Sequence, residues 1–159
     1  MLFRSAIGVI GTAGTIASGA YERAIKALRP DAKVHGQACP LFVPLVEEGW
    51  FEHPAAELIA REYLGPLRRA RIDVLVLGCT HYPLLKPLLA RVMGPGVKLV
   101  DSAEETATVV ARELERLDLL ANGAGHEHRF VVSDDEPHFR KVGALLLGEK
   151  LKRVEVVPL

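Results

Sequence analysis

The strongest constraint on the fold is a regular alternation of short apolar runs with longer segments of helical periodicity. The sharpest apolar run is VLVL at residues 74–77, and weaker runs lie at residues 6–10, 33–38 and 97–100. Segments with apolar residues at helical spacing separate them. Strands that alternate with helices favour a mostly parallel sheet with helices on both faces, so we predict an α/β fold.

The other expected elements continue this pattern to the end of the chain. Helices are predicted at residues 16–28, 41–48, 54–71, 84–93 and 103–120, and a final strand, helix and strand at 129–132, 137–147 and 154–157. Gly65–Pro66 is expected to kink or break the third of these helices, because proline lacks an N–H group and clashes with the preceding turn. The composition changes at the loop 122–126, which is the one candidate domain boundary in the sequence.

Length and charge exclude several classes of protein. A chain of 159 residues is long enough for about one domain with its own core. Twenty Lys and Arg balance twenty Asp and Glu, so charge gives no reason to expect a nucleic acid or a membrane surface as partner. The apolar segment after Arg4 resembles a secretory signal, but glycines interrupt it, and a strand with a tight loop fits better. We therefore expect a cytoplasmic protein with reduced thiols.

The segment GCTHYP, directly after VLVL, carries the clearest chemical signal. In an open parallel sheet, ligands bind beyond the carboxyl ends of the strands, and this position places Cys79 at that rim. Pro83 fits the first turn of a helix, with Thr80 or His81 near the helix N-terminus. A thiol beside an imidazole is a candidate nucleophile or proton-transfer group, with His81 as its acid partner. The alternative is that Cys79 is a small buried hydrophobic residue and Thr80 a helix cap.

Other segments give weaker signals. The loop GTAGT lacks the GxGxxG spacing, and no acidic residue ends the second strand, so a nucleotide cofactor is not expected. Thr12 and Thr15 in this loop remain candidates to donate hydrogen bonds to a small carboxylate substrate. Cys39 has apolar neighbours and is interpreted as a structural thiol. The cysteines form no CxxC motif, and His126 and His128 have no ligand cluster nearby, so no metal site is predicted.

The motifs together resemble one known family. LVLGCTHYPLL (75–85) resembles the second catalytic-cysteine motif of the glutamate racemases. Further segments resemble this family in its order and spacing: IGVIGTAGTIASGAY (7–21), ACPLFVPLVEEG (38–49), LVDSAEETA (99–107) and FVVSDDEPHFRKVGALLLGE (130–149). The resemblance covers nearly everything after Ser5. The aspartate racemases are relatives that usually lack this whole set.

The resemblance implies a cofactor-independent isomerase that interconverts L- and D-glutamate and supplies D-glutamate for peptidoglycan, and hence for cell wall biogenesis and cell shape. In this family two thiols flank the substrate α-carbon, and one removes the proton that the other replaces. Cys79 would be the second thiol, on the face that deprotonates the L-isomer, and His81 would assist it. Thr80 and His81 would also contact substrate. Glu47 matches a family carboxylate near this site, although a surface or capping glutamate is the alternative.

The sequence departs from the family in one large respect. The family has a first domain with DSG, YG and CNT motifs, the last carrying the first catalytic cysteine, and residues 1–159 contain none of these. We therefore interpret residues 1–101 as the second racemase domain and residues 102–159 as the C-terminal segment that in the family returns to the first domain. Half an active site is expected, inactive without the missing domain or a homo-oligomeric partner.

Three alternatives stay open from the sequence. The first is a racemase for aspartate or a related amino acid. The second is a carboxylate-binding or interaction module without catalysis. The third alternative, Cys39 as the second thiol, is disfavoured because Cys39 and Cys79 would lie on neighbouring strand ends of one domain.

Overall fold

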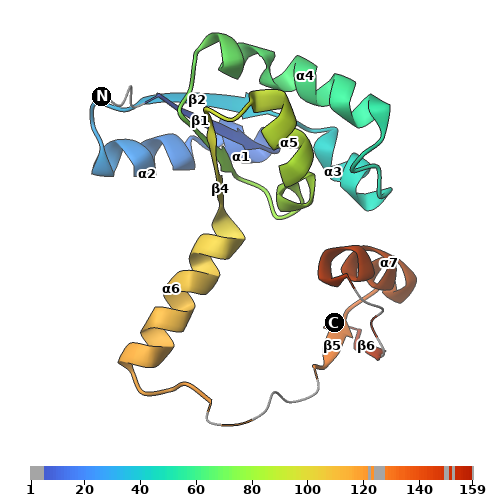
Figure 1. Cartoon of the computed structure of the whole chain (residues 1–159). Helices are drawn as coiled ribbons and strands as arrows, with labels where there is room; N and C mark the ends of the chain where they lie inside the picture. The colour runs from blue at the N-terminus through green and yellow to red at the C-terminus, as the bar shows by residue number, and fades with distance from the viewer. Residues whose placement is uncertain (1–5, 122, 124–127, 149–150, 152, 159) are drawn as a thin grey trace. The chain divides into compact units, whose positions relative to one another are not determined.

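The computed structural model describes residues 6–121, 123, 128–148, 151 and 153–158, and the chain divides into two compact units (Figure 1). The first unit is Met1–Glu113 and the second is Leu114–Leu159. The division falls inside helix α6 (Ser102–Arg116), whereas the family resemblance suggests a boundary at residue 101.

The first unit is a four-stranded parallel sheet with its connecting helices. Its elements are β1 (Ala6–Gly11), α1 (Ala13–Ala17), α2 (Ala20–Leu28), β2 (Lys33–Ala38), α3 (Phe42–Glu47), α4 (Pro54–Arg69), β3 (Val74–Leu77), the 3-10 helix η1 (Tyr82–Leu85), α5 (Lys86–Met93), β4 (Lys98–Asp101) and the beginning of α6. The strand order is β2-β1-β3-β4, and every pair of neighbours is parallel. The predicted α/β class with a parallel sheet is confirmed.

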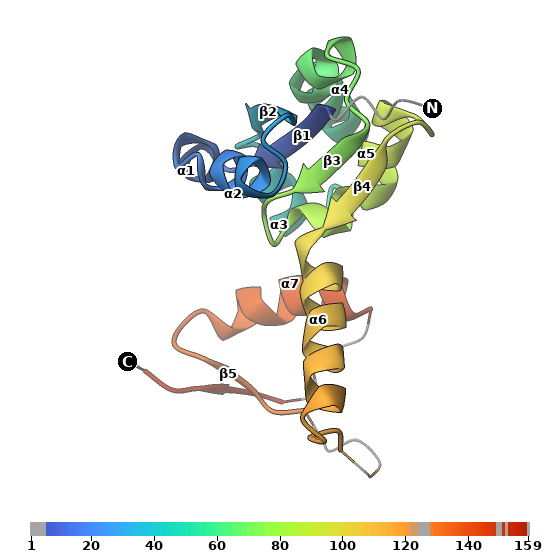
Figure 2. The same ribbon diagram turned by 90° about the vertical axis from the view of Figure 1, so that its left-hand side faces the viewer.

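Helices lie on both faces of this sheet, as Figures 1 and 2 show. On one face, α3, α4, η1 and α5 enclose the main core with the inward side chains of β1 and β3. On the other face, α1 and α2 lie over β1 and β2. A Cβ atom at Gly36 of β2 would come within 3.2 Å of the Ile16 side chain of α1, so α1 packs closely on this edge strand.

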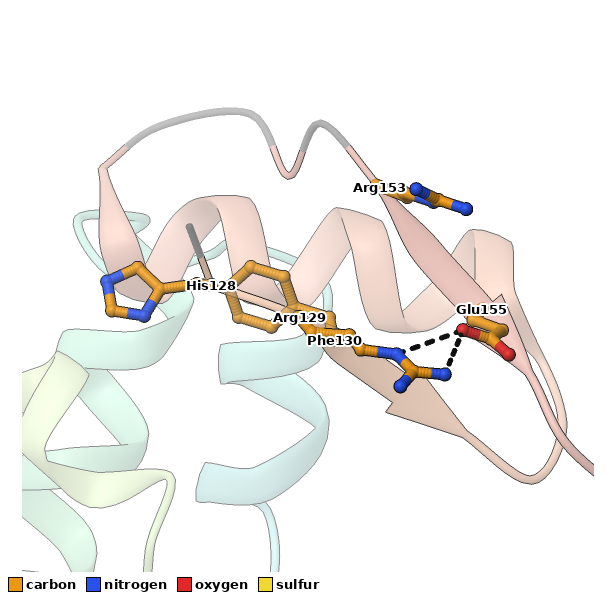
Figure 3. Close-up of a pocket in the computed structure, with 5 residues that line it drawn as sticks. All are labelled: His128, Arg129, Phe130, Arg153 and Glu155. Atoms are coloured by element: carbon orange, nitrogen blue, oxygen red, sulfur yellow. Dashed lines mark hydrogen bonds and ion pairs between the residues drawn. The ribbon is translucent and has the colours of Figure 1, made fainter. Parts of the chain in front are cut away.

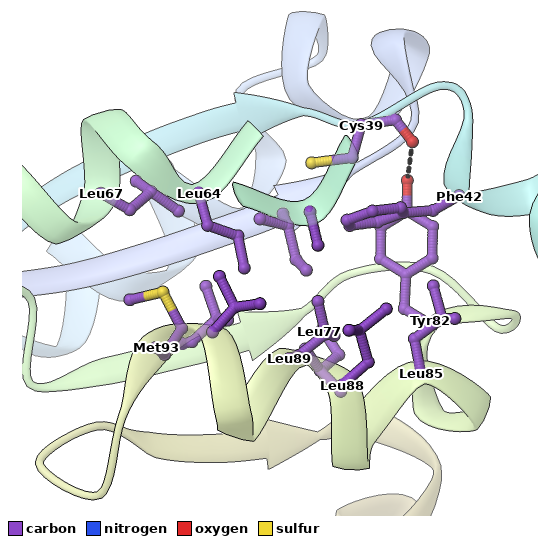
Figure 4. Close-up of a cluster of buried hydrophobic side chains, with 14 of the residues drawn as sticks. Cys39, Phe42, Leu64, Leu67, Leu77, Tyr82, Leu85, Leu88, Leu89 and Met93 are labelled. Atoms are coloured by element: carbon purple, nitrogen blue, oxygen red, sulfur yellow. Dashed lines mark hydrogen bonds between the residues drawn. The ribbon is translucent and has the colours of Figure 1, made fainter. Parts of the chain in front are cut away.

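The core reaches up to the loops that follow β2 and β3 (Figure 4). Fully buried side chains from six elements meet there: Ile10, Phe42, Leu64, Leu75, Leu77, Tyr82, Leu88 and Leu89. The ring of Phe42 meets Tyr63 and Tyr82 edge to face, with centroid separations of 5.4 and 5.3 Å. Because Phe42 and Tyr82 each follow a strand end, this aromatic contact fixes two rim loops to the core.

Two helix predictions are corrected by the structure. The single helix expected at residues 16–28 is divided into α1 and α2, because Gly19 adopts a left-handed conformation with φ of 63°. The break expected at Gly65–Pro66 is wrong, since α4 continues through Pro66 to Arg69. Pro66 is exposed, so water can satisfy the carbonyl that loses its partner, and the amide of Ala70 donates to the Pro66 carbonyl at 3.0 Å.

The second unit contains the end of α6 followed by a small βαβ arrangement. Its strands β5 (Phe130–Val132) and β6 (Val154–Val156) pair in parallel, and α7 (Glu136–Leu147) connects them. These agree with the predicted strand, helix and strand to within one residue at each end. Several apolar side chains on this unit are exposed: Val131, Phe139, Leu145, Leu146, Leu147, Val156 and Val157.

A pocket of about 470 Å³ lies beside the two strands of the second unit (Figure 3). Its lining residues are His128, Arg129, Phe130, Arg153 and Glu155. The guanidinium of Arg129 donates to the Glu155 carboxylate at 2.7 and 3.1 Å, so its charge is already paired. None of the predicted site residues lines this pocket, and His126 lies outside the described residues.

Candidate active site

The four strands of the first unit end at one rim of the sheet, because all four are parallel. Thr12 follows β1, Cys39 follows β2, Gly78 follows β3, and Asp101 ends β4. The loop after β3 therefore brings Cys79 to the edge where open parallel sheets bind their ligands.

Gly78 allows the end of β3 to approach β1 closely. A Cβ atom at this position would lie 2.8 Å from the Ile10 carbonyl oxygen and 3.0 Å from the Tyr21 ring, so a side chain has no room. The Gly78 amide instead donates to the same carbonyl at 2.8 Å. This backbone contact holds the start of the Cys79 loop against the centre of the sheet.

The structure brings Thr80, His81 and Glu47 into one chain of contacts. The Oγ1 atom of Thr80 lies 3.4 Å from Nδ1 of His81, and Nε2 of His81 lies 3.4 Å from Oε1 of Glu47. Glu47 is the last residue of α3, so the packing of that helix sets the position of the carboxylate. A carboxylate beside an imidazole orients the ring, and an oriented imidazole suits a group that assists proton transfer.

Cys79 directly precedes Thr80 in the loop after β3. Its side chain is half-buried and packs partly against the core cluster, and its carbonyl accepts a hydrogen bond from the Tyr82 amide at 3.2 Å. Cys79 is therefore partly accessible to solvent, in contrast to the buried Cys39.

Thr12 and Thr15 reach the same rim but contact each other. The Thr12 hydroxyl caps α1 by accepting from the Thr15 amide at 3.2 Å, and the two hydroxyl oxygens are 2.9 Å apart. The capping role is plain from this geometry. Their role as substrate donors stays a prediction.

Cys39 has the surroundings of a structural thiol. Its side chain is fully buried and donates to the Gln37 carbonyl at 3.6 Å. Burial raises the pKa of the Cys39 thiol to about 12, so it is protonated at neutral pH. One expectation about it is wrong: β1 separates β2 from β3, so the two cysteines do not follow neighbouring strands.

Sequence reasoning missed the tyrosine that joins the two cysteine loops. The buried hydroxyl of Tyr82 donates to the Cys39 carbonyl at 2.8 Å (Figure 4). Burial, with smaller contributions from Cys39 and Cys79, raises the pKa of this phenol, so the hydroxyl remains a donor across the physiological range. The available signal was the position of Tyr82 directly after the CTH motif. A tyrosine at the start of a helix can have several roles, so this position alone did not identify the contact with Cys39.

Alkylation is expected to distinguish the two thiols strongly. Iodoacetamide at neutral pH should label Cys79 of the folded chain at least about tenfold faster than Cys39, because the thiolate reacts and the Cys39 thiol is both buried and protonated. Peptide mass spectrometry over a time course measures both rates, and labelling in urea provides the unfolded reference. Faster labelling of Cys39 in the folded chain would contradict this assignment.

Within the described residues, no group of three or more His, Cys, Asp or Glu side chains is arranged to hold a metal ion. In the same part of the chain, every helix is too short or too polar to cross a membrane.

Sequence comparison finds close similarity to named enzymes. The model of the Asp/Glu/Hydantoin racemase family matches residues 1–110. The chain is 54% identical over 155 residues to the glutamate racemase of Geobacter metallireducens and 52% identical over 155 residues to that of Syntrophus aciditrophicus. Each alignment covers 96% of this chain and 57% of the relative, so the chain spans little more than half the length of these enzymes.

Solved structures give the same pattern. A glutamate racemase isoform of Bacillus anthracis matches with a TM-score of 0.89 and 36% identity, covering 98% of this chain and 58% of that one. The glutamate racemase of Francisella tularensis, solved in complex with D-glutamate, matches with a TM-score of 0.87 and 36% identity, covering 96% and 57%.

Proposed function

The chain belongs to the Asp/Glu/Hydantoin racemase family, and on that premise we propose that it provides one half of the active site of a glutamate racemase. The observation that supports this most directly is the rim arrangement, in which Cys79 precedes a Thr80–His81–Glu47 chain of contacts. The named relatives at 54% and 52% identity are glutamate racemases, which favours glutamate over other amino acids as the substrate.

The proposed chemistry is proton exchange at the α-carbon of glutamate. The Cys79 thiolate takes the α-proton of L-glutamate, and the electron pair of the broken C–H bond is held by the adjoining carboxylate as an enediolate. A thiol on the opposite face then donates its proton to the same carbon and gives D-glutamate. Two bases are needed because one group cannot reach both faces of the carbon.

The other rim residues have distinct roles in this proposal. His81 assists Cys79 as an acid and base, and Glu47 orients its ring. Thr80, Thr12 and Thr15 donate hydrogen bonds to the substrate carboxylates. Thiol chemistry of this kind needs neither a metal nor an organic cofactor, and it needs a reduced Cys79, which suits the cytoplasm.

The partner is the portion of the racemase that the chain does not span. We propose that residues 1–101 form the second racemase domain and that residues 102–159 return to the missing first domain, which carries the other thiol. The exposed apolar side chains of the second unit are consistent with a surface that another segment covers. Since D-glutamate is a building block of peptidoglycan, the completed enzyme would serve cell wall biogenesis.

The test compares the chain alone with the completed enzyme. The chain is fused to the unmatched part of the Geobacter metallireducens glutamate racemase, and exchange of the α-hydrogen of L- and D-glutamate is followed by NMR in deuterated water. We expect racemisation by the fusion and only background exchange by the chain alone. L- and D-aspartate, offered in parallel, should be poor substrates.

Three outcomes would contradict the proposal. Racemisation by the chain alone would show that half a site is sufficient, and preference for aspartate would assign a different substrate. A folded fusion that binds glutamate without exchanging its α-hydrogen would favour a carboxylate-binding module.

A further inference from the structure

A buried carboxylate lies at the end of β4, away from the Cys79 chain of contacts. Asp101 is only 4% exposed, and it is the one charged residue that is buried in the described part of the chain. It is also the last residue before α6, and its Oδ1 accepts a hydrogen bond from the Ala103 amide at 2.8 Å. A buried carboxylate is costly unless a positive charge balances it.

That positive charge comes from the first residue of α5. The ammonium of Lys86 lies 3.5 Å from Oδ2 of Asp101 and 2.5 Å from Oε1 of Glu104 in the first turn of α6. Its side chain is 28% exposed, so solvent screens the contact with Asp101 only in part. The hydrogen bond that Lys86 donates to Glu104, with smaller contributions from the charges of Glu104 and Asp101, raises the pKa of Lys86, which is therefore charged at neutral pH.

The position of Lys86 links two parts of the proposed mechanism. The helix α5 follows directly on η1, which begins after His81, whereas α6 is the segment by which the chain leaves the sheet. All described residues from 102 to 120 are exposed, so within the described part of the chain α6 lacks the apolar burial that fixes other helices. The direction of α6 is therefore determined mainly by the contacts of its first turn.

We propose that Lys86 is a positioning residue that neutralises Asp101, fixes the first turn of α6 against α5, and so sets the direction in which the chain leaves the Cys79 rim. Its effect on catalysis rests on the proposed function, because α6 leads toward the segment that would meet the missing domain. Its effect on α6 does not depend on that function.

The primary experiment measures amide hydrogen exchange of residues 102–113 in the 159-residue chain. The variant Lys86→Met keeps an unbranched apolar side chain one atom shorter and removes the charge, and exchange in this segment should become at least about tenfold faster. Lys86→Arg keeps the charge and should stay within about threefold of the unmodified chain. The matched control is Lys26→Met, which breaks the Lys26–Glu22 pair of 2.5 Å, whose side chains are 49% and 51% exposed, and should leave the segment unchanged.

A suppressor variant distinguishes charge balance from simple packing. Asp101→Asn removes the buried charge and still accepts from the Ala103 amide, so Lys86→Met combined with Asp101→Asn should recover most of the lost protection. If Lys86→Met fails to fold, the double variant and Glu104→Gln, expected to speed exchange about threefold, carry the test. Unchanged exchange in Lys86→Met, or a double variant as unprotected as the single one, would overturn the proposal.

The catalytic consequence is measured separately in the fused racemase. Lys86→Met should lower kcat for glutamate by about tenfold, and Lys86→Arg should restore it, because charge rather than shape is required. An unaltered kcat in Lys86→Met would refute the link to catalysis. Absence of racemisation in every variant and in the parent would instead refute the proposed function and leave the exchange result standing.

Discussion

Replacement of Cys79 by alanine is expected to lower glutamate racemisation by the completed enzyme at least about a hundredfold in both directions, since a positioned proton-transfer group contributes roughly 10²–10⁴-fold. The alanine side chain leaves one face of the glutamate α-carbon without a base, so a proton can no longer be removed from one face and replaced on the other. Initial rates from L- and D-glutamate, followed by circular dichroism, measure the effect.

The matched control is Cys39→Ala, which removes the other thiol of the chain. Cys39 is fully buried and hydrogen-bonded to the Gln37 carbonyl, so its loss should cost some stability and leave racemisation within about threefold. Equal activity losses in the two variants would mean that Cys79 matters for structure and not for chemistry.

Replacement of Phe42 by alanine is expected to reduce the free energy of unfolding of the first unit by about 3–5 kcal/mol. The Phe42 ring is 0% exposed and makes edge-to-face contacts with Tyr63 and Tyr82, so truncation removes both buried area and two aromatic contacts. Urea denaturation followed by the fluorescence of Trp50, the one tryptophan of the chain, reports on this unit.

Leu28→Ala is the control for that experiment. Leu28 is also a large apolar side chain at the end of a helix, but it is 83% exposed, and its loss should change the unfolding free energy by less than about 0.5 kcal/mol. A Phe42→Ala midpoint that matches the Leu28→Ala midpoint would show that the aromatic contact does not hold the rim loops.

The fold class followed from the sequence because strand and helix periodicities differ so clearly here. VLVL at residues 74–77 coincides with β3, and residues 33–38 coincide with β2. Two local predictions differ from the structure. A continuous helix was expected at Gly19, but its left-handed conformation ends α1 there. A break was expected at Pro66, but this exposed proline lies within a continuous helix. Local propensity does not include these tertiary and solvent effects.

The candidate site was only partly accessible to sequence reasoning. Cys79 and His81 are neighbours in sequence, so their common loop was predictable. The contact between His81 and Glu47 depends on where α3 packs, and the family resemblance rather than the spacing pointed to Glu47. The Lys86–Asp101 pair joins the start of α5 to the end of β4, two positions that no local pattern relates. The strand order β2-β1-β3-β4 likewise had no signal in the sequence.

That strand order has a consequence for how the chain is made. β1 is synthesised before the other three strands of this sheet, yet it lies inside the sheet, with β2 on one edge and β3 on the other. Its second edge has no partner until synthesis has passed Leu77, and such non-local parallel pairing is slow. The nascent chain therefore carries an open apolar strand edge while residues 39–77 are synthesised, and this edge of β1 is paired only when β3 is released.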